Sequence, residues 1–325
     1  MSATLALPLR RRRRLSLSQE WLLVIAIAAL FLVVGLINPR FVAERNLQSV
    51  LLGNAYIAVA AIGMSMVIIS GNIDISVGSL IGVLATVSGS LAVAGLPSPL
   101  AWLAAVLLGV VVMMLQGALV AYLGIPSIVV TLGMLSILKG GLISVTNGVW
   151  ITNLPEDFHL SQGSLFGMIP VPVVFMLLLT IAAAWWMRNT AAGRTIYAVG
   201  GNAEAARLCG MGRERTVMMV FAIHGMFVGI AAVLFATQLS VIQSSVPQNL
   251  ELTIITASVV GGVSILGGTG TVVGSTLAAI LIAAIGSSLI FVNISPYWLR
   301  TVQGMLILVT VLADIYRRRK RGLAR

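Results

Sequence analysis

The chain has 325 residues, of which 59% are hydrophobic and 9% are charged. Soluble domains carry roughly a quarter of charged residues, so this composition excludes a soluble globular protein and indicates a protein embedded in a lipid bilayer. The net charge of +11 does not indicate a nucleic-acid partner, because the basic residues gather in three short segments.

Only a helix satisfies its own backbone hydrogen bonds inside hydrocarbon, and about 20 apolar residues are enough to cross it. The sequence therefore predicts an all-α polytopic membrane protein. Its ten predicted helices are 20–37, 49–69, 75–95, 99–123, 127–146, 169–187, 216–240, 251–267, 272–292 and 299–315. The first run lacks a small-residue cleavage site, so we interpret it as a membrane helix and not as a signal peptide.

The basic residues predict the orientation of the chain. Sixteen of the 20 lie at Arg10–Arg14, around a central polar segment, and at 317–325. Lys and Arg concentrate in cytoplasmic loops, so we expect both termini and the central segment to be cytoplasmic, with Arg40 and Arg45 as exceptions. The domain plan is a basic tail at 1–19, one transmembrane domain at 20–316 with a cytoplasmic loop near 188–215, and a second basic tail at 317–325.

A polar interruption follows the second predicted helix, in the segment Ser70–Ser79. A carboxylate facing lipid is costly, so Asp74 must meet water, a partner or backbone amides. Its side chain either caps the next helix or shapes the turn, or it contacts a transported solute. The candidate residues for a helix break or a translocation path here are Ser70, Asn72, Asp74 and Ser76. Lys139 poses the same question in the fifth helix, where it could also extend to the interface.

The central polar segment, Gly193–Met211, is the longest stretch that cannot lie in lipid. Asn202 is a good N-cap for a short helix over Ala203–Cys209, and Gly210 is a good helix end. An amphipathic connector lying on lipid headgroups is the alternative to a docking helix. The candidate docking residues are Gly200, Gly201, Asn202, Glu204, Ala205, Ala206, Arg207 and Gly210.

A glycine-rich run at Gly261–Gly270 predicts a bend, a re-entrant turn or a close helix crossing. A gate is the second interpretation. The candidate residues are Gly261, Gly262, Gly267 and Gly268. The pattern GxGxxxG at 268–274 is one residue too long for a dinucleotide fingerprint, and no GxxxxGK[ST] phosphate loop occurs. If the protein uses ATP, we expect a separate chain to bind it.

The reactive residues do not predict an enzyme. The nine acidic residues are scattered, and His159 and His224 have no acidic or cysteine partner at ligand spacing. Cys209 is the single cysteine, so no disulfide or thiolate metal cluster is expected. We expect no catalytic residue, no metal and no cofactor on this chain.

Five ordered motifs resemble the inner-membrane permease subunits of bacterial ATP-binding-cassette importers for monosaccharides of the ribose and xylose type. Ser70–Ser79 is similar to that family's SGGIDLSVGS, with Asn72 in place of the second glycine. Gly193–Met211 resembles its GRxxYAxGGNxxAAxxxGI. The other resembling segments are Pro126–Gly133, with Lys139 and Gly140 beyond it, Ala257–Gly270 and Pro296–Trp298.

The resemblance implies a multi-pass protein of the bacterial inner membrane that imports a monosaccharide or related small polyol. It implies as partners a second permease chain in a homo- or heterodimer, a cytoplasmic ATPase and a periplasmic sugar-binding protein, besides membrane lipid. It also implies that Gly193–Met211 docks the ATPase. An ion-coupled secondary transporter, with Asp74, Lys139 or Glu251 as the ion site, is the alternative. The sequence does not identify the sugar.

Overall fold

The computed structural model describes residues 18–165 and 169–320. The expected basic segment Arg10–Arg14 and the end of the basic C-terminal tail, 321–325, lie outside these residues. The regular secondary structure of the described part is almost entirely helical. Its two short strands, β1 (Ser164–Leu165) and β2 (Ile169–Pro170), pair antiparallel.

The α-helices follow one another along the chain with short connections. They are α1 (Gln19–Ile37), α2 (Glu44–Ile69), α3 (Val77–Val93), α4 (Ser98–Ala121), α5 (Ser127–Thr146), α6 (Val171–Asn189), α7 (Ala191–Gly201), α8 (Ala203–Leu208), α9 (Arg213–Ala236), α10 (Leu250–Val260), α11 (Val272–Phe291) and α12 (Trp298–Lys320). Two 3-10 helices, η1 (Pro39–Val42) and η2 (Glu156–Gln162), lie in loops.

The predicted all-α polytopic fold is confirmed, and a helix occupies each of the ten predicted positions. Eight helices in the described residues are long and apolar enough to cross a membrane, whereas α3 and α10 have 17 and 11 residues. The prediction for 251–267 was too long, because α10 ends at Val260. Gly262 then adopts a φ of +96°, a left-handed conformation that stops the helix although apolar residues continue beyond it.

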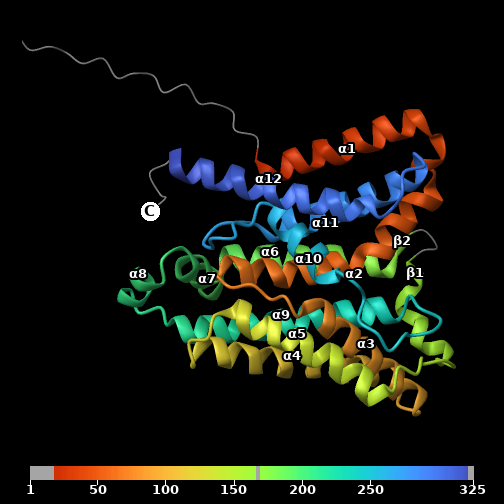
Figure 1. The fold of residues 1–325 in the computed structure, drawn as a ribbon, viewed down its shortest axis with the longest axis horizontal. Helices are drawn as coiled ribbons and strands as arrows, with labels where there is room; N and C mark the ends of the chain where they lie inside the picture. Colours follow the sequence, from red (N-terminus) through yellow and green to blue (C-terminus); the bar gives the residue numbers. More distant parts are fainter. Residues whose placement is uncertain (1–17, 166–168, 321–325) are drawn as a thin grey trace, which may run out of the picture.

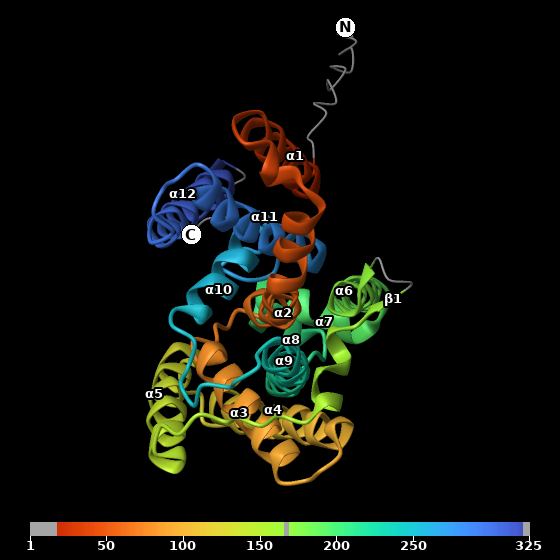
Figure 2. The same cartoon turned by 90° about the vertical axis from the view of Figure 1, so that its right-hand side faces the viewer.

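Helices α2 and α9 form the centre of the bundle. Seen end-on in Figure 2, they lie between α6 on one side and α3, α4 and α5 on the other; α10 and α11 both pack against α2, and α1 and α12 lie outside them. Most residues of α2 and α9 are buried, whereas α1, α5 and α12 expose most of theirs. A helix that is apolar all round can be buried in protein or face lipid, so this layering is typical of a membrane-embedded bundle.

The basic segments that the structure describes lie toward one end of the molecule. Figure 1 shows α8, the beginning of α1 and the end of α12 facing the same end, and the loops before α2 and after α11 at the opposite end. The charge pattern requires the two termini and the central polar segment to lie on the same side of the membrane, and the structure places the described ends of the chain and α8 at the same end. Which of the two ends is cytoplasmic stays a prediction from the positive-inside rule.

Candidate functional site

The segment 70–76 separates α2 from α3 and is held by its own side chains. Ser70 Oγ donates to the carbonyl of Val67 at 2.7 Å, and Asn72 Nδ2 donates to Ser70 Oγ at 3.0 Å. The amide of Ile73 donates to Ser127 Oγ at the start of α5, at 3.2 Å. The interruption expected from the sequence is therefore an ordered, hydrogen-bonded connection and not a loose loop.

Asp74 is the centre of a fully buried polar cluster. One carboxylate oxygen accepts hydrogen bonds from the amide and the hydroxyl of Ser76, both at 2.7 Å. The other lies 3.1 Å from Nε2 of His224 on α9. Gln116 on α4 donates from Nε2 to Ser76 Oγ at 3.0 Å. Asp74 thus shapes the turn before α3 and ties it to α4 and α9.

This cluster gives His224 an acidic partner that sequence spacing did not reveal. His224 and Asp74 are 150 residues apart, so no spacing rule could pair them, and only the packing of α9 against the 70–76 segment brings them together. Both side chains are completely buried, and neither lines any of the cavities described below. A buried charge needs such partners, because an unpaired one is strongly unfavourable.

Three glycine segments meet near the end of the bundle that carries α8. We call Gly71, Gly200, Gly201, Gly267 and Gly268 the glycine junction. A Cβ atom on Gly200 would overlap the carbonyl oxygen of Ile69, and one on Gly268 would lie 2.5 Å from the Cα of Gly201. The amide of Gly268 donates to the carbonyl of Ile69 at 2.8 Å. The junction therefore joins the end of α2, the end of α7 and the loop after α10 through direct backbone contact.

The other two candidate glycines of this loop also make close contacts. Gly261 follows the last residue of α10, and a Cβ atom there would lie 2.5 Å from the Cα of Ser275 on α11. Gly262 faces the side chain of Gln19 on α1, whose Nε2 donates to the carbonyl of Val260 at 3.2 Å. These two glycines thus bring the end of α10 against α11 and α1, so the close crossing predicted from the sequence is present here.

The polar segment 193–211 folds as two helices. α8 begins as expected, because Asn202 Oδ1 accepts from the amides of Glu204 at 3.1 Å and Ala205 at 3.0 Å, and Gly210 follows it with a φ of +81°. The preceding α7 was not predicted. It is capped by Thr190, whose hydroxyl accepts from the amide of Gly193 at 3.0 Å.

Most side chains of α8 are exposed. Ala206 is buried, whereas Glu204, Ala205, Arg207 and Leu208 are exposed, with Leu208 81% exposed. α7 anchors α7 and α8 to the bundle, because the Tyr197 hydroxyl donates a hydrogen bond to the carbonyl of Gly270 at 3.0 Å. Burial raises the pKa of the Tyr197 phenol, so this donor stays protonated. A short capped helix with an exposed apolar and charged surface is suited to contact another protein.

A polar cavity of about 440 Å³ opens at the end opposite α8, between the beginnings of α2 and α12 and the end of α11. Its lining contains no charged residue and no histidine. The hydrogen-bonding side chains are Asn46, Ser49, Asn54, Tyr56, Gln248, Thr253, Ser287 and Gln303. We call this space the polar mouth. Pockets of about 300 to 1,000 Å³ hold small organic ligands.

A smaller polar cavity of about 220 Å³ lies next to the polar mouth and shares Pro247 and Gln248 with it. Lys139 on α5 and Glu251 on α10 line it together with Ser79 on α3. Of the candidate path residues, Lys139 is the one that lines either polar cavity. The structure places Ser70, Asn72, Asp74 and Ser76 inside protein, where they hold the segment between α2 and α3.

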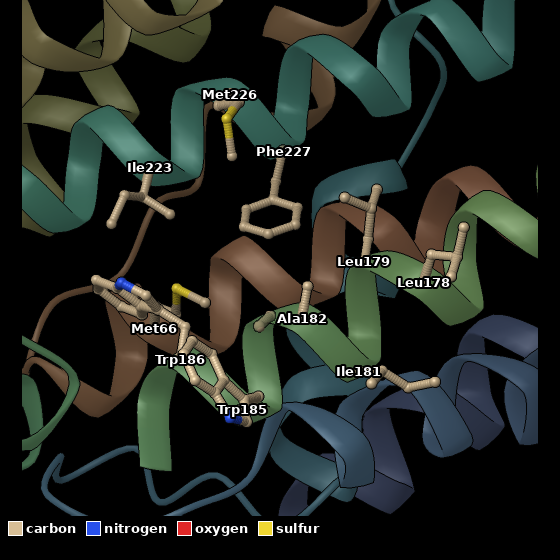
Figure 3. A pocket seen from close by; sticks show the side chains of 11 residues that line it. Met66, Leu178, Leu179, Ile181, Ala182, Trp185, Trp186, Ile223, Met226 and Phe227 are labelled. Atoms are coloured by element: carbon tan, nitrogen blue, oxygen red, sulfur yellow. The ribbon is translucent and has the colours of Figure 1, made fainter. Parts of the chain in front are cut away.

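A third cavity has a different character. It measures about 710 Å³ and lies between α2, α6 and α9, and Figure 3 shows Met66, Trp186 and Phe227 facing into it. Apart from the indole nitrogens of its two tryptophans, its lining side chains carry no nitrogen or oxygen. A polyhydroxylated solute would lose its hydrogen bonds to water there without replacement, so this groove is suited to hydrocarbon.

Comparisons with known proteins identify the family. Residues 46–311 match the family described as branched-chain amino acid transport system / permease component. The chain belongs to this permease family. The autoinducer 2 import system permease protein LsrC of Salmonella typhimurium is 35% identical over 297 residues, which cover 91% of this chain and 86% of that protein. LsrC of Yersinia pseudotuberculosis serotype O:1b is 35% identical over 298 residues, covering 91% and 85%. No solved structure matches.

Family membership confirms the resemblance found in the sequence. The chain is a permease subunit of an ATP-binding-cassette importer, a multi-pass inner-membrane transport component and not an enzyme, and the ATPase resides on a separate subunit. The family implies a second permease chain, an ATPase and a periplasmic binding protein as partners. It does not favour the ion-coupled secondary transporter that the charged residues had left open.

Proposed function

We propose that this permease subunit imports a neutral, polyhydroxylated small molecule, a monosaccharide or related small polyol. The observation that carries the proposal is the lining of the polar mouth, which offers hydroxyl, amide and aromatic groups and no charge. Such groups exchange hydrogen bonds with sugar hydroxyls, whereas a charged clamp selects ionic solutes. The permease relatives named for autoinducer 2 import make that compound one member of the test panel.

From the polar mouth the solute path continues toward the segment 70–76 through the neighbouring cavity, where the opposite formal charges of Lys139 and Glu251 sum to zero. Both cavities share Pro247 and Gln248. The two short helices α3 and α10 meet beyond them, since a Cβ atom on Gly78 would lie 2.5 Å from a carboxylate oxygen of Glu251. Transporters place substrate sites where helices are interrupted near the bilayer midplane, and α3 and α10 are the helices too short to cross.

α8 docks the ATPase and serves as the coupling helix. Its exposed Arg207 and Leu208 supply charged and apolar contacts, and its capped ends keep it rigid. A displacement of α8 passes to α7 and from there to the glycine junction. Direct backbone contacts at the junction keep the three chain segments from moving independently. The junction includes the residues that follow α2, so the displacement reaches the 70–76 segment that precedes α3.

The uptake experiment uses proteoliposomes that contain the permease, its ATPase and its binding protein. With ATP inside, we expect uptake of a pentose, hexose, deoxysugar, polyol or autoinducer 2, and no uptake of leucine or of an organic acid. Uptake that needs a sodium or proton gradient and no ATPase would overturn the importer mechanism. ATP-driven uptake of leucine alone would overturn the solute class.

The docking experiment uses co-purification with the ATPase. Arg207→Glu reverses an exposed charge on α8. Ala205→Pro removes the backbone amide that donates a hydrogen bond to Asn202 Oδ1. Both variants should therefore lose most of the bound ATPase while still inserting normally into the membrane. Arg40→Glu, an exposed charge reversal at the opposite end, is the control and should retain it. Normal ATPase recovery with both α8 variants would refute the assignment.

A further inference from the structure

Two arginines at the end of α6 have no carboxylate partner within the described residues. Arg188 lies in the last turn of α6, and Arg194 follows it on α7. Both side chains are exposed. Arg194 Nη1 donates to the carbonyl of Asn189 at 3.2 Å, so its guanidinium is held beside the end of α6. The two cations are therefore available to an anion that this part of the chain does not supply.

Both arginines line one cavity of about 590 Å³ between α1, α6, α7 and α11. Glu20 is the single acidic residue in the lining, and its Oε1 already accepts from the hydroxyl of Thr271 at 2.8 Å. Two arginines and one glutamate give the lining a net formal charge of +1. The apolar part of the wall consists of Ala184, Met187, Val272 and Val273. A cavity with cationic and apolar walls fits an anion that carries a hydrocarbon chain.

The neighbouring tryptophans place this cavity at the level of the lipid headgroups. Trp185 and Trp186 directly precede the last residues of α6, and Trp185 is 63% exposed. Tryptophan is enriched where the hydrocarbon of a bilayer meets its polar surface. The span of α6 ends three residues later, at Asn189. An anion that reaches Arg188 from the bilayer is therefore the phosphate of a phospholipid.

The apolar groove between α2, α6 and α9 begins on the side of α6 that carries Arg188. Ile181, Trp185 and Arg188 are spaced by four and three residues, which places their side chains along one side of the helix. Ile181 and Trp185 line the groove, and Phe227 of α9 lines its far side (Figure 3). α6 lies at the outer edge of the bundle in Figure 2, so an acyl chain can enter the groove from the bilayer.

We propose that the cationic cavity and the apolar groove together bind one anionic phospholipid. Arg188 and Arg194 donate hydrogen bonds to the headgroup phosphate, and one acyl chain lies along Trp185 and Ile181 in the groove. A guanidinium can donate two parallel hydrogen bonds to one phosphate, and basic pockets between membrane helices are suited to anionic headgroups. The site depends on the lipid and not on which solute the permease carries.

A photoreactive lipid tests this site in the assembled transporter, reconstituted in phosphatidylcholine nanodiscs. The probe is a phosphatidylglycerol with a diazirine in one acyl chain, and mass spectrometry locates its adducts. We expect adducts in the groove segments 178–186 and 223–227, which contain its lining residues on α6 and α9. Their yield should be several times the yield from a phosphatidylethanolamine with the same acyl chain, because that headgroup has no net charge.

Arginine variants test the headgroup contact. Arg188→Gln combined with Arg194→Gln should lower the phosphatidylglycerol yield several-fold, to the level of phosphatidylethanolamine. Arg213→Gln combined with Arg215→Gln is the matched control, because it removes two exposed positive charges at the start of α9. The control should keep the full yield. Ala182→Phe, which places a ring in the groove, should lower the yield with all arginines intact.

The other outcomes overturn the proposal. Equal yields from the two lipids would mean that the groove meets hydrocarbon without selecting a headgroup. An unchanged phosphatidylglycerol yield in the Arg188 and Arg194 variant, or an equal loss in the control, would remove these arginines from the site. Loss of bound ATPase with unchanged lipid adducts would assign them to the ATPase. Competition by soluble glycerol phosphate would mean that the cavity binds a soluble anion and not a lipid.

Discussion

At the scale of single residues, the glycine junction shows why small side chains recur in this chain. The backbone of Gly200 lies so close to the carbonyl of Ile69 that a methyl group has no place. Overpacking of this kind costs about 1–3 kcal/mol in an ordinary core, and here the opposing atoms are backbone, which relaxes less. The glycines therefore keep three chain segments in contact, as the proposed transmission of movement requires.

We expect Gly200→Ala to lower the melting temperature of the purified protein and to reduce solute-stimulated ATP hydrolysis of the complex. Gly53→Ala is the matched control, because a Cβ there meets nothing within 4 Å and alanine favours the helical conformation of α2. Differential scanning fluorimetry in detergent measures the first effect. Equal melting temperatures for the two variants would show that the close contact at Gly200 is not required.

Asp74 and His224 form the second residue-scale feature, a pair with no exposed surface. His224→Leu leaves a carboxylate oxygen of Asp74 without its partner, which is more unfavourable than losing both groups together. In a double-mutant cycle, His224→Leu should therefore destabilise the protein less when Asp74→Asn is already present, by about 0.5–3 kcal/mol. Additive changes in the free energy of unfolding would mean that the two side chains do not interact.

At the scale of elements, α8 depends on its cap more than a long helix would. Six residues cannot form a stable helix alone, and Asn202 satisfies the amides of Glu204 and Ala205. Asn202→Ala should weaken α8 by about 0.5–2 kcal/mol, seen as faster amide hydrogen exchange in 203–209 and less bound ATPase. Asn202→Asp keeps an acceptor and should behave as the unmodified chain. If alanine and aspartate give the same exchange rates, the cap does not hold α8.

The elements also show what the sequence could and could not predict. Long apolar runs predicted the helices because hydrocarbon leaves a chain few alternatives, and the Asn202 cap was visible because its hydrogen bonds are local. α10 was predicted too long, since Val263, Ile265 and Leu266 continue the apolar pattern past the left-handed Gly262. α7 was missed because its helix lies in a polar segment without a full apolar run.

The candidate site was harder to predict from the sequence, because its contacts are not local. The Asp74 and His224 contact, the glycine junction and the polar mouth all join segments far apart in the chain. No periodicity reports such contacts. Polar residues of the mouth, such as Asn46, Gln248 and Gln303, lie singly at helix ends or in connections, where each alone has many ordinary explanations.

At the scale of the whole molecule, the orientation in the membrane follows from charge and is testable with the single native cysteine. Cys209 is exposed beside α8, at the end where the described termini lie. A membrane-impermeant maleimide should label it in inside-out vesicles and not in intact spheroplasts. Val149→Cys in a Cys209→Ser background lies in the loop after α5, is 67% exposed and should show the reverse pattern. Labelling of Cys209 from the periplasmic side would invert the topology.

We propose that α8 is where the permease receives the work of ATP hydrolysis. The most direct measurement attaches a short photoreactive crosslinker to native Cys209 in the assembled transporter and identifies the adducts by mass spectrometry. We expect ATPase peptides as the main protein adducts, with a yield that changes between the nucleotide-free and the ATP-bound complex. Adducts confined to lipid, or ATPase adducts whose yield is independent of nucleotide, would contradict it.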